Sequence, residues 1–502
     1  MANKACYEVV TAAKMPMTVF DMISAMQDKY ADRVAFRYVE GKDTVVEKTY
    51  AQYVQDIRKM TGYLQQELGN PKGKKVVILS RTNYEYGVVV FGTMMAGAVI
   101  VTLNQGKTWA ELEYELGLTE PDLILNDGID YGCRAQLEAA YGGKLRPMDV
   151  WKDAAPAELS NRIDHEGLLM LMFTSGTTGR SKGVMLSEKN YFAASQMYIN
   201  GQKVIPEIEE KLAPRYLDRV VSHFTLVPMF HLAGFICYFV YGIQGWSLNL
   251  CCDARDLRRD MSLMHSDAMS TPPVLVEMIY NEIKRGHADR LNGLWNLSCS
   301  SAILDPSILS YLVEHGVYIN QCYSMTELAG YGLLNVAQDG DHLRALGKPD
   351  GFCEVKVDET GEICVRGDCV MLGYYKDPEA TAETIDKDGW LHSGDLARVD
   401  DEGYFYMTGR KKNLIILDSG ENVSPEELEK LLGKCDAIKE CIVKEMGKKI
   451  GTIVCCDDDK QQQVKDFVTE LNRTLPMYKR VSVVECSKQP LPRNALGKLL
   501  RK

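Results

Sequence analysis

Two long uncharged segments constrain the fold of this 502-residue chain more than any other feature. Residues 86–103 and 232–250 each approach the length of a membrane-spanning helix. Glycines interrupt both segments, and each one ends in a β-branched or alternating stretch that is typical of a strand. We therefore expect each segment to form a buried helix, a turn and a buried strand, and we expect no transmembrane segment.

The same alternation of helix and strand recurs along most of the chain. Residues 76–79, a helical pattern that ends near Met95, and residues 98–103 form a βαβ unit, which is the unit that builds parallel sheets. Further strands are predicted at 221–227, 247–252, 294–298 and 316–320, with helices at 256–265, 273–285 and 306–315. The large N-terminal region is therefore predicted to be α/β, with doubly wound sheets.

The pattern changes to short strands after Gly347, with strands predicted at 354–357, 361–367 and 403–407. Past Gly409 the order becomes βαββαβ, from strands at 414–417, 441–444, 452–456 and 481–484 and a last helix at 464–475. Ser424, Pro425 and Glu427 predict a capping box at the start of the first of these helices. We expect a large domain of residues 1–409 and a small α+β domain of residues 410–502.

Composition excludes some classes of function. The net charge of -11 argues against a general nucleic-acid surface. The N-terminus carries no basic region followed by an apolar stretch, so no secretion signal is expected. The 15 cysteines are scattered, without metal-ligand spacing, which favours reduced thiols in a cytoplasmic protein and argues against a cysteine-bound metal.

Residues 174–183, Thr-Ser-Gly-Thr-Thr-Gly-Arg-Ser-Lys-Gly, have the composition of a polyphosphate-binding loop, and we call them the phosphate loop. Hydroxyl groups, glycines that let main-chain N–H groups approach a ligand, and the Lys182 cation would all contact phosphate oxygens. The spacing is not that of a Walker A loop, and no helical pattern follows. We therefore expect a strand, the loop and a second strand.

Four further segments accompany the phosphate loop, at 321–327 (Gln-Cys-Tyr-Ser-Met-Thr-Glu), 389–395 (Gly-Trp-Leu-His-Ser-Gly-Asp), 406–410 (Tyr-Met-Thr-Gly-Arg) and 491–498 (Leu-Pro-Arg-Asn-Ala-Leu-Gly-Lys). Taken singly, Ser393-Gly-Asp395 indicates only a turn. In order and spacing the five segments resemble the motifs of the adenylate-forming (ANL) superfamily, of the acyl-CoA synthetase or AMP-dependent acid–CoA ligase type. The resemblance covers essentially the whole chain. It implies that a carboxylate attacks the α-phosphate of ATP, that pyrophosphate leaves, and that the acyl-adenylate passes to a thiol.

The resemblance also implies roles for particular residues. Glu327 would bind Mg²⁺, the preceding Thr326 would be a catalytic residue beside it, and Tyr323 would stack on adenine. Asp395 and Arg410 would bind the ribose. The remaining nucleotide contacts would come from Thr174, Ser175, Gly176, Thr177, Thr178, Gly179, Lys182, Ser301, Ala302, Cys322 and Ser324.

The small domain is expected to move. Lys498 matches the catalytic lysine that bridges the substrate carboxylate and the α-phosphate, so the two domains must close over ATP. Lys412 stands at the hinge position, about which Gly420 and Glu421 would replace Lys498 at the active site.

Residues 227–235 narrow the choice of the substrate acid. They resemble the border of the acyl pocket and contain no carboxylate. Because amino-acid-activating relatives place an Asp there, a fatty or aryl acid is expected and an amino acid is disfavoured. His231, in this segment, is either a core histidine or a group that gates the substrate. Serines stand where glycines are common at Ser301 and Ser324, which predicts a smaller or more polar pocket than an unmodified long-chain tunnel. Ser181 replaces a common proline and is expected to matter little.

The acceptor of the acyl group is expected to be a thiol, because no marked insertion interrupts residues 373–390. Coenzyme A is the default acceptor, and the phosphopantetheine of a carrier protein is the alternative. Two other classes stay open at this point, a non-catalytic nucleotide sensor and a luciferase-like oxygenase. The catalytic residues Lys498 and Glu327 argue against the sensor.

Overall fold

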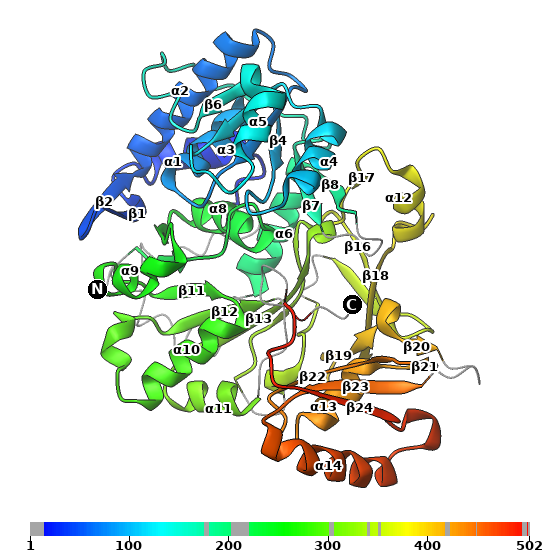
Figure 1. Ribbon diagram of the computed structural model, residues 1–502. Coiled ribbons are helices and arrows are strands. Elements are labelled where there is room, and N and C mark those ends of the chain that lie inside the picture. Colours follow the sequence, from blue (N-terminus) through cyan, green and yellow to red (C-terminus); the bar gives the residue numbers. More distant parts are fainter. Residues whose placement is uncertain are drawn as a thin grey trace. The chain divides into compact units, whose positions relative to one another are not determined.

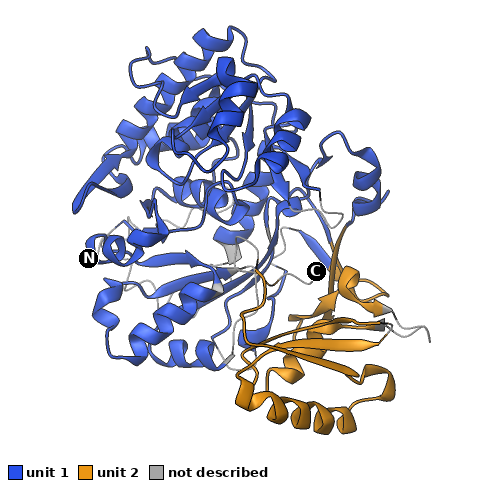
Figure 2. Cartoon of the chain, in the orientation of Figure 1, with its two compact units in different colours: residues 1–355, 365–391 blue, residues 356–364, 392–502 orange. Residues whose placement is uncertain are grey.

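The computed structural model describes residues 15–174, 180–201, 220–300, 306–338, 342–349, 353–416, 422–447, 449–493 and 499. The chain forms two compact units, Met1–Val355 with Val365–Leu391, and Lys356–Cys364 with His392–Lys502 (Figure 2). The second unit thus includes short strands that the sequence assigned to the large domain. A moving boundary after residue 409, with its hinge near Lys412, stays a prediction.

The first unit contains a seven-stranded sheet with the order β17-β8-β7-β4-β3-β5-β6 (Figure 1). Its strands β3 to β7 run parallel to one another, whereas β8 is antiparallel to both β7 and β17. The predicted βαβ unit is confirmed as β3, α3 and β4. The elements are α2 (Tyr50–Leu68), β3 (Lys75–Leu79), α3 (Tyr84–Ala96), β4 (Val99–Thr102), α4 (Trp109–Thr119), β5 (Leu123–Asn126), α5 (Arg134–Tyr141), β6 (Leu145–Pro147), β7 (Met170–Thr174), β8 (Lys182–Leu186) and β17 (Gly373–Tyr374).

An eight-stranded sheet of the same unit has the order β14-β13-β12-β11-β9-β10-β1-β2. The six strands from β13 to β1 in this order are parallel to one another, and the edge strands β14 and β2 are antiparallel to their neighbours. Its strands are β1 (Val34–Glu40), β2 (Thr44–Thr49), β9 (Ser222–Thr225), β10 (Ser247–Leu250), β11 (Ala268–Thr271), β12 (Asn296–Ser300), β13 (Tyr318–Met325) and β14 (Gly330–Asn335). The accompanying helices are α1 (Val19–Asp28), α6 (Glu188–Gly201), α8 (Leu232–Gln244), α9 (Leu257–Leu263), α10 (Pro273–Lys284) and α11 (Pro306–Glu314).

The sequence located the three helices α9, α10 and α11 correctly, but it missed β11. This strand, Ala-Met-Ser-Thr, is four residues long and has one β-branched residue, so local propensity does not mark it. It becomes a strand because it lies between β9 and β12 and pairs with both.

The two uncharged segments form a helix, a glycine turn and a strand, as predicted. Gly97 and Gly245 end α3 and α8 with φ of 81° and 64°, a conformation that glycine adopts without strain. The two helices pack on each other, with the Phe91 ring 6.0 Å from Tyr238 and 5.6 Å from Phe239 between centroids. Every residue of α3 except Glu85 is buried, which explains its lack of charge. No helix among the described residues is long and apolar enough to cross a membrane.

A four-stranded sheet, β15-β16-β18-β19, follows in the chain and supplies the predicted β-rich part. Its strands are β15 (Glu354–Val357), β16 (Glu362–Arg366), β18 (Leu391–Val399) and β19 (Phe405–Arg410). Ser393-Gly-Asp395, which taken singly has the composition of a turn, lies inside β18. Gly394 has a φ of 74°, so the residue pattern reflects a local distortion within the strand.

The C-terminal part contains a three-stranded sheet, β22-β23-β24, and a separate pair, β20-β21. The predicted βαββαβ order is found, with one additional two-residue strand, β21, which pairs with the first strand, β20. The elements are β20 (Ile415–Ile416), β21 (Asn422–Val423), α13 (Pro425–Leu432), β22 (Glu440–Glu445), β23 (Ile450–Cys455), α14 (Gln461–Thr474) and β24 (Val483–Ser487).

The predicted capping box at the start of α13 is wrong. Ser424 is the N-cap residue, but its hydroxyl donates to the Thr408 carbonyl at 2.9 Å and makes no cap hydrogen bond. Glu427 instead pairs with Lys479 at 2.8 Å. Both side chains therefore serve contacts with distant parts of the chain, which sequence spacing alone does not reveal.

His223, on β9, is fully buried in the first unit and takes part in a hydrogen-bond network. The Ser270 main-chain N–H donates to Nε2 at 3.0 Å, so the proton of the neutral ring is on Nδ1, which donates to the Tyr241 hydroxyl at 2.7 Å. Burial lowers the pKa of His223 to about 3. The unfolded chain therefore binds a proton at this residue at a higher pH than the folded chain does.

We predict that His223 makes the protein sensitive to acid. Its folded-state pKa is lowered, so its contribution to stability is complete above pH ~6.5 and is lost as the pH falls from there toward 3, by about 1.4 kcal/mol per pH unit. Thermal unfolding of the wild type and His223→Gln between pH 7.5 and 5 should show the wild type ahead at neutral pH and the gap narrowing in acid. The exposed His315→Gln is the control, and a gap for His223→Gln that does not change with pH would contradict the prediction.

Candidate active site

The phosphate loop connects two neighbouring antiparallel strands. β7 ends at Thr174 and β8 begins at Lys182, and these two residues face each other in the strand pairing. The predicted strand, loop and strand are therefore confirmed. The predicted phosphate ligands Ser175, Gly176, Thr177, Thr178 and Gly179 lie outside the described residues.

Tyr374 connects the Lys182 side chain to Glu327. The Lys182 ammonium lies 4.7 Å from the centre of the Tyr374 ring, and the Tyr374 hydroxyl donates to the Glu327 carboxylate at 2.9 Å. Burial, followed by the negative charge of Glu327, raises the pKa of Tyr374, so the hydroxyl stays protonated and stays a donor. Among the described residues no carboxylate pairs with Lys182, so its positive charge is available to an anion.

Main-chain hydrogen bonds fix this arrangement. Tyr374 lies on β17, which pairs with β8, and the Tyr375 N–H donates to the Gly183 carbonyl at 2.7 Å. The Met371 N–H donates to the Glu327 carbonyl at 2.8 Å. One short segment, residues 371–375, therefore holds both the phosphate loop strand and the predicted metal ligand. The sequence did not identify Tyr374, and its only local indication is an aromatic pair after a glycine.

Glu327 and Thr326 lie in a short helical turn, Thr326–Leu328, directly after β13. The preceding residues Tyr323 and Cys322 are buried, and Ser324 is half-buried. Burial raises the pKa of the Cys322 thiol to about 12, which makes it a neutral, unreactive wall group. The two other predicted residues of this region, Ser301 and Ala302, lie outside the described residues.

His231 is the N-cap residue of α8. Its Nδ1 accepts a hydrogen bond from the Ala233 N–H at 3.2 Å, so the ring proton is on Nε2. Burial lowers the pKa of His231, which favours the neutral ring. This cap contact gives the histidine a structural role, and substrate gating stays a prediction.

Asp395 and Arg410, the predicted ribose pair, meet in the second unit. They face each other across β18 and β19, and Arg410 Nε lies 2.8 Å from the Asp395 carboxylate. Lys412 follows in a short helical turn, Lys411–Asn413. Three further predicted residues of this unit, Gly420, Glu421 and Lys498, lie outside the described residues.

Glu362 fixes both sides of this ribose pair. Its side chain is 3% exposed, and its carboxylate accepts a hydrogen bond from the Gly394 N–H at 2.7 Å and pairs with Lys411 at 2.8 Å. Gly394 precedes Asp395 and Lys411 follows Arg410 in the chain. The sequence missed Glu362 because the contact with Gly394 joins residues 32 positions apart.

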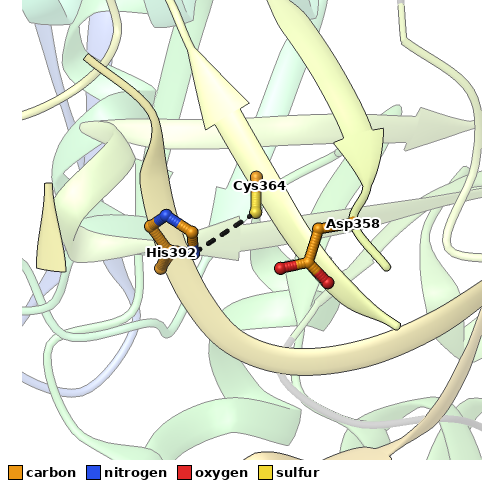
Figure 3. A group of neighbouring side chains, drawn as sticks. All are labelled: Asp358, Cys364 and His392. Atoms are coloured by element: carbon orange, nitrogen blue, oxygen red, sulfur yellow. Dashed lines mark hydrogen bonds between the residues drawn. The ribbon is translucent and has the colours of Figure 1, made fainter. Parts of the chain in front are cut away.

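Three further side chains, Asp358, Cys364 and His392, have their candidate ligand atoms within 4.8 Å of one another (Figure 3). His392 Nδ1 also lies 3.4 Å from the Glu362 carboxylate. His392 Nδ1 lies 3.5 Å from the Cys364 sulfur. A cysteine, a histidine and a carboxylate could bind zinc. However, the Asp358 carboxylate already accepts the Glu362 N–H at 2.9 Å, and the hydrogen bond with the Glu362 side chain raises the pKa of the neighbouring Lys411. We therefore interpret the group as a hydrogen-bond network.

We predict that Tyr374→Phe weakens the use of Mg²⁺ in the ATP–pyrophosphate exchange that the motifs imply. Losing a hydrogen bond to a charged carboxylate should lower the exchange rate at limiting Mg²⁺ about tenfold. Saturating Mg²⁺ should recover part of the loss, and the neighbouring Tyr375→Phe should behave as the wild type. Equal Mg²⁺ titrations for Tyr374→Phe and the wild type would remove the phenol from the site.

Comparisons with known proteins agree with the motifs. Residues 24–375 match the AMP-binding enzyme family. Feruloyl-CoA synthase of Amycolatopsis sp is 30% identical over 480 residues, which cover 90% of this chain and 92% of that protein. A long-chain-fatty-acid–CoA ligase of Escherichia coli O157:H7 is 28% identical over 547 residues, which cover 97% and 93%.

Solved structures share the fold. ATP-bound MatB of Rhodopseudomonas palustris superposes with a TM-score of 0.82 at 23% identity, covering 97% of both chains. MenE of Bacillus subtilis, in complex with its acyl-adenylate intermediate, gives 0.81 at 23% identity, covering 96% and 97%. Together with the family match over residues 24–375, these likenesses show that the chain belongs to the AMP-binding enzymes of the ANL superfamily and is an acyl-CoA synthetase-type ligase.

Proposed function

We propose that this ligase activates a fatty or aryl carboxylic acid with ATP and transfers the acyl group to coenzyme A. The observation that carries the proposal is the connection of Lys182 to Glu327 through Tyr374. Through Tyr374, the connection joins Lys182, which has no carboxylate partner among the described residues, to Glu327, whose carboxylate accepts the Tyr374 hydroxyl. Such a pair suits a triphosphate and a hard cation that must be held side by side.

The first half-reaction has to bring an anionic carboxylate to a polyanion. Lys182 and the phosphate loop would hold the β- and γ-phosphates, which then leave as pyrophosphate. Glu327 and Thr326 offer hard oxygen atoms that fit Mg²⁺, and the bound ion would supply positive charge against the negative charge that develops on the phosphates. Tyr374 would orient the Glu327 carboxylate through its hydrogen bond.

The second unit would supply the remaining groups. Asp395 can accept hydrogen bonds from the ribose hydroxyls while Arg410 holds the carboxylate in place. Lys498 would bridge the substrate carboxylate and the α-phosphate. Rotation near Lys412 would then bring Gly420 and Glu421 forward for the transfer to the thiol.

The acid is proposed to be apolar or aromatic, with a polar group or limited length. Residues 227–235 contain no carboxylate that could pair with a substrate amine, and His231 is held by its cap hydrogen bond in a form that favours the neutral ring. Ser324 adds a hydroxyl where the resemblance expects glycine. The names of the relatives, which include a feruloyl-CoA synthase and a long-chain-fatty-acid–CoA ligase, cover both kinds of acid.

Coenzyme A is the proposed acceptor, in keeping with the relatives' names. The phosphopantetheine of an acyl carrier protein presents the same thiol-bearing arm. It is therefore the second candidate for the same half-reaction.

An exchange assay tests the proposal. Carboxylate-dependent incorporation of labelled pyrophosphate into ATP is measured over fatty, aryl and amino acids, and we expect exchange with fatty or aryl acids only. Adding coenzyme A or a pantetheinylated carrier to the best acid then identifies the acceptor by its thioester. Exchange that occurs only with amino acids, or with no acid, would refute the proposal.

Two variants should separate the half-reactions. Lys498→Ala should abolish adenylate formation yet still convert supplied acyl-adenylate to the thioester. Lys412→Pro should keep adenylate formation but slow thioester formation, because proline fixes the backbone at the proposed hinge. Wild-type adenylation by Lys498→Ala, or equal loss of both steps in Lys412→Pro, would contradict these roles.

A further inference from the structure

Helix α4 contacts the last residues of the phosphate loop one by one. The Arg180 guanidinium lies 5.6 Å from the centre of the Tyr114 ring, and the Ser181 hydroxyl donates to the Glu115 carboxylate at 2.6 Å. Tyr114 and Glu115 are consecutive in α4, and Arg180 and Ser181 directly precede Lys182. The helix therefore touches the chain at the point where the loop leaves for β8.

Glu115 is an unusual residue for this position because its side chain is 0% exposed. Lys107, whose side chain is 19% exposed, forms an ion pair with the same carboxylate oxygen that accepts the Ser181 hydroxyl. Within the described part of the chain, Lys107 and Ser181 are the two donors to this side chain. A buried carboxylate is costly without such partners, so Glu115 binds Ser181 strongly and directionally.

The C-terminal end of α4 contacts the segment that follows β17. The Lys376 ammonium donates to the Leu118 carbonyl and to the Glu120 carboxylate, both at 3.0 Å. Lys376 follows Tyr374, which lies beneath Lys182. Helix α4 thus holds Ser181, the residue before Lys182, through Glu115. Its C-terminal end holds Lys376, which lies two residues after Tyr374, the aromatic partner of Lys182.

We infer that Glu115, with its counter-charge Lys107, is a positioning residue for the polyphosphate of ATP. It holds Ser181 and thereby directs Lys182, the next residue, toward the β- and γ-phosphates. Ser181 stands where proline is common, and from the sequence we expected this replacement to matter little. Its contact with Glu115 assigns it a role that proline would perform by restricting the backbone, because both restrain the exit of the loop. The inference rests on the proposed function of the phosphate loop.

Nucleotide binding by the full chain tests this inference. Isothermal titration calorimetry with Mg²⁺ and the non-hydrolysable analogue AMP-CPP is compared with AMP for the wild type and Ser181→Ala. Losing a hydrogen bond to a charged group should weaken AMP-CPP binding about tenfold. The affinity for AMP, which lacks the β- and γ-phosphates, should not change.

Three further variants complete the design. Ser181→Thr keeps a hydroxyl and should restore AMP-CPP binding. Glu115→Gln should weaken it, and adding Ser181→Ala to Glu115→Gln should cause little further loss. Thr119→Ala removes another buried hydroxyl of α4, one that donates to the Glu115 carbonyl, and should lower the melting temperature without changing the AMP-CPP to AMP ratio.

Each outcome decides something. Equal AMP-CPP binding by the wild type and Ser181→Ala would overturn the positioning role, as would parallel losses for AMP-CPP and AMP. Failure of Ser181→Thr to restore binding would also overturn it. If the wild type binds neither nucleotide, the proposed function itself fails, which is distinguishable from a wild type that binds both.

Discussion

The pairing of β17 with β8 is the interaction on which the candidate site of the first unit depends. β17 has two residues, yet it adds an edge to the seven-stranded sheet directly beside the strand that starts at Lys182. Gly373 suits the start of β17, because an added Cβ there would lie 2.7 Å from the Thr381 methyl group and its φ of 134° is one that other residues rarely adopt. The pairing puts the Tyr374 ring under Lys182 and its hydroxyl on Glu327. A two-residue strand thus joins the loop and the predicted metal ligand into one site.

Elements with a clear residue pattern could be predicted from sequence. Helices α3 and α8, buried between the two sheets, could be recognised because they have almost no charged residues. Their C-terminal glycines mark where each helix ends. Strand β11 could not be predicted, because it is short and the strands that pair with it, β9 and β12, lie far along the chain. The mistaken capping box of α13 has the same origin, since Ser424 and Glu427 contact Thr408 and Lys479.

The candidate site likewise contains residues that could be predicted from the sequence and residues that could not. The resemblance to the family's motifs pointed to Lys182, Glu327, Asp395 and Arg410, and their roles stay predictions. Motifs did not identify the residues that hold them. Tyr374 reaches Glu327 across 47 positions, and Ser181 reaches Glu115 across 66. The supporting contacts are set by topology, so they appear only once the sheets are assembled.

The lysines of the two units show how the fold assigns different tasks to one kind of side chain. Lys107 and Lys411 each pair with a glutamate whose side chain is at most 3% exposed, so their positive charge compensates a buried negative charge. Lys182 contacts an aromatic ring instead, and no carboxylate among the described residues neutralises it. A ring restrains an ammonium group without cancelling its charge. The fold can therefore hold Lys182 in position and still leave its charge to an anion, which is what its proposed role in binding pyrophosphate needs.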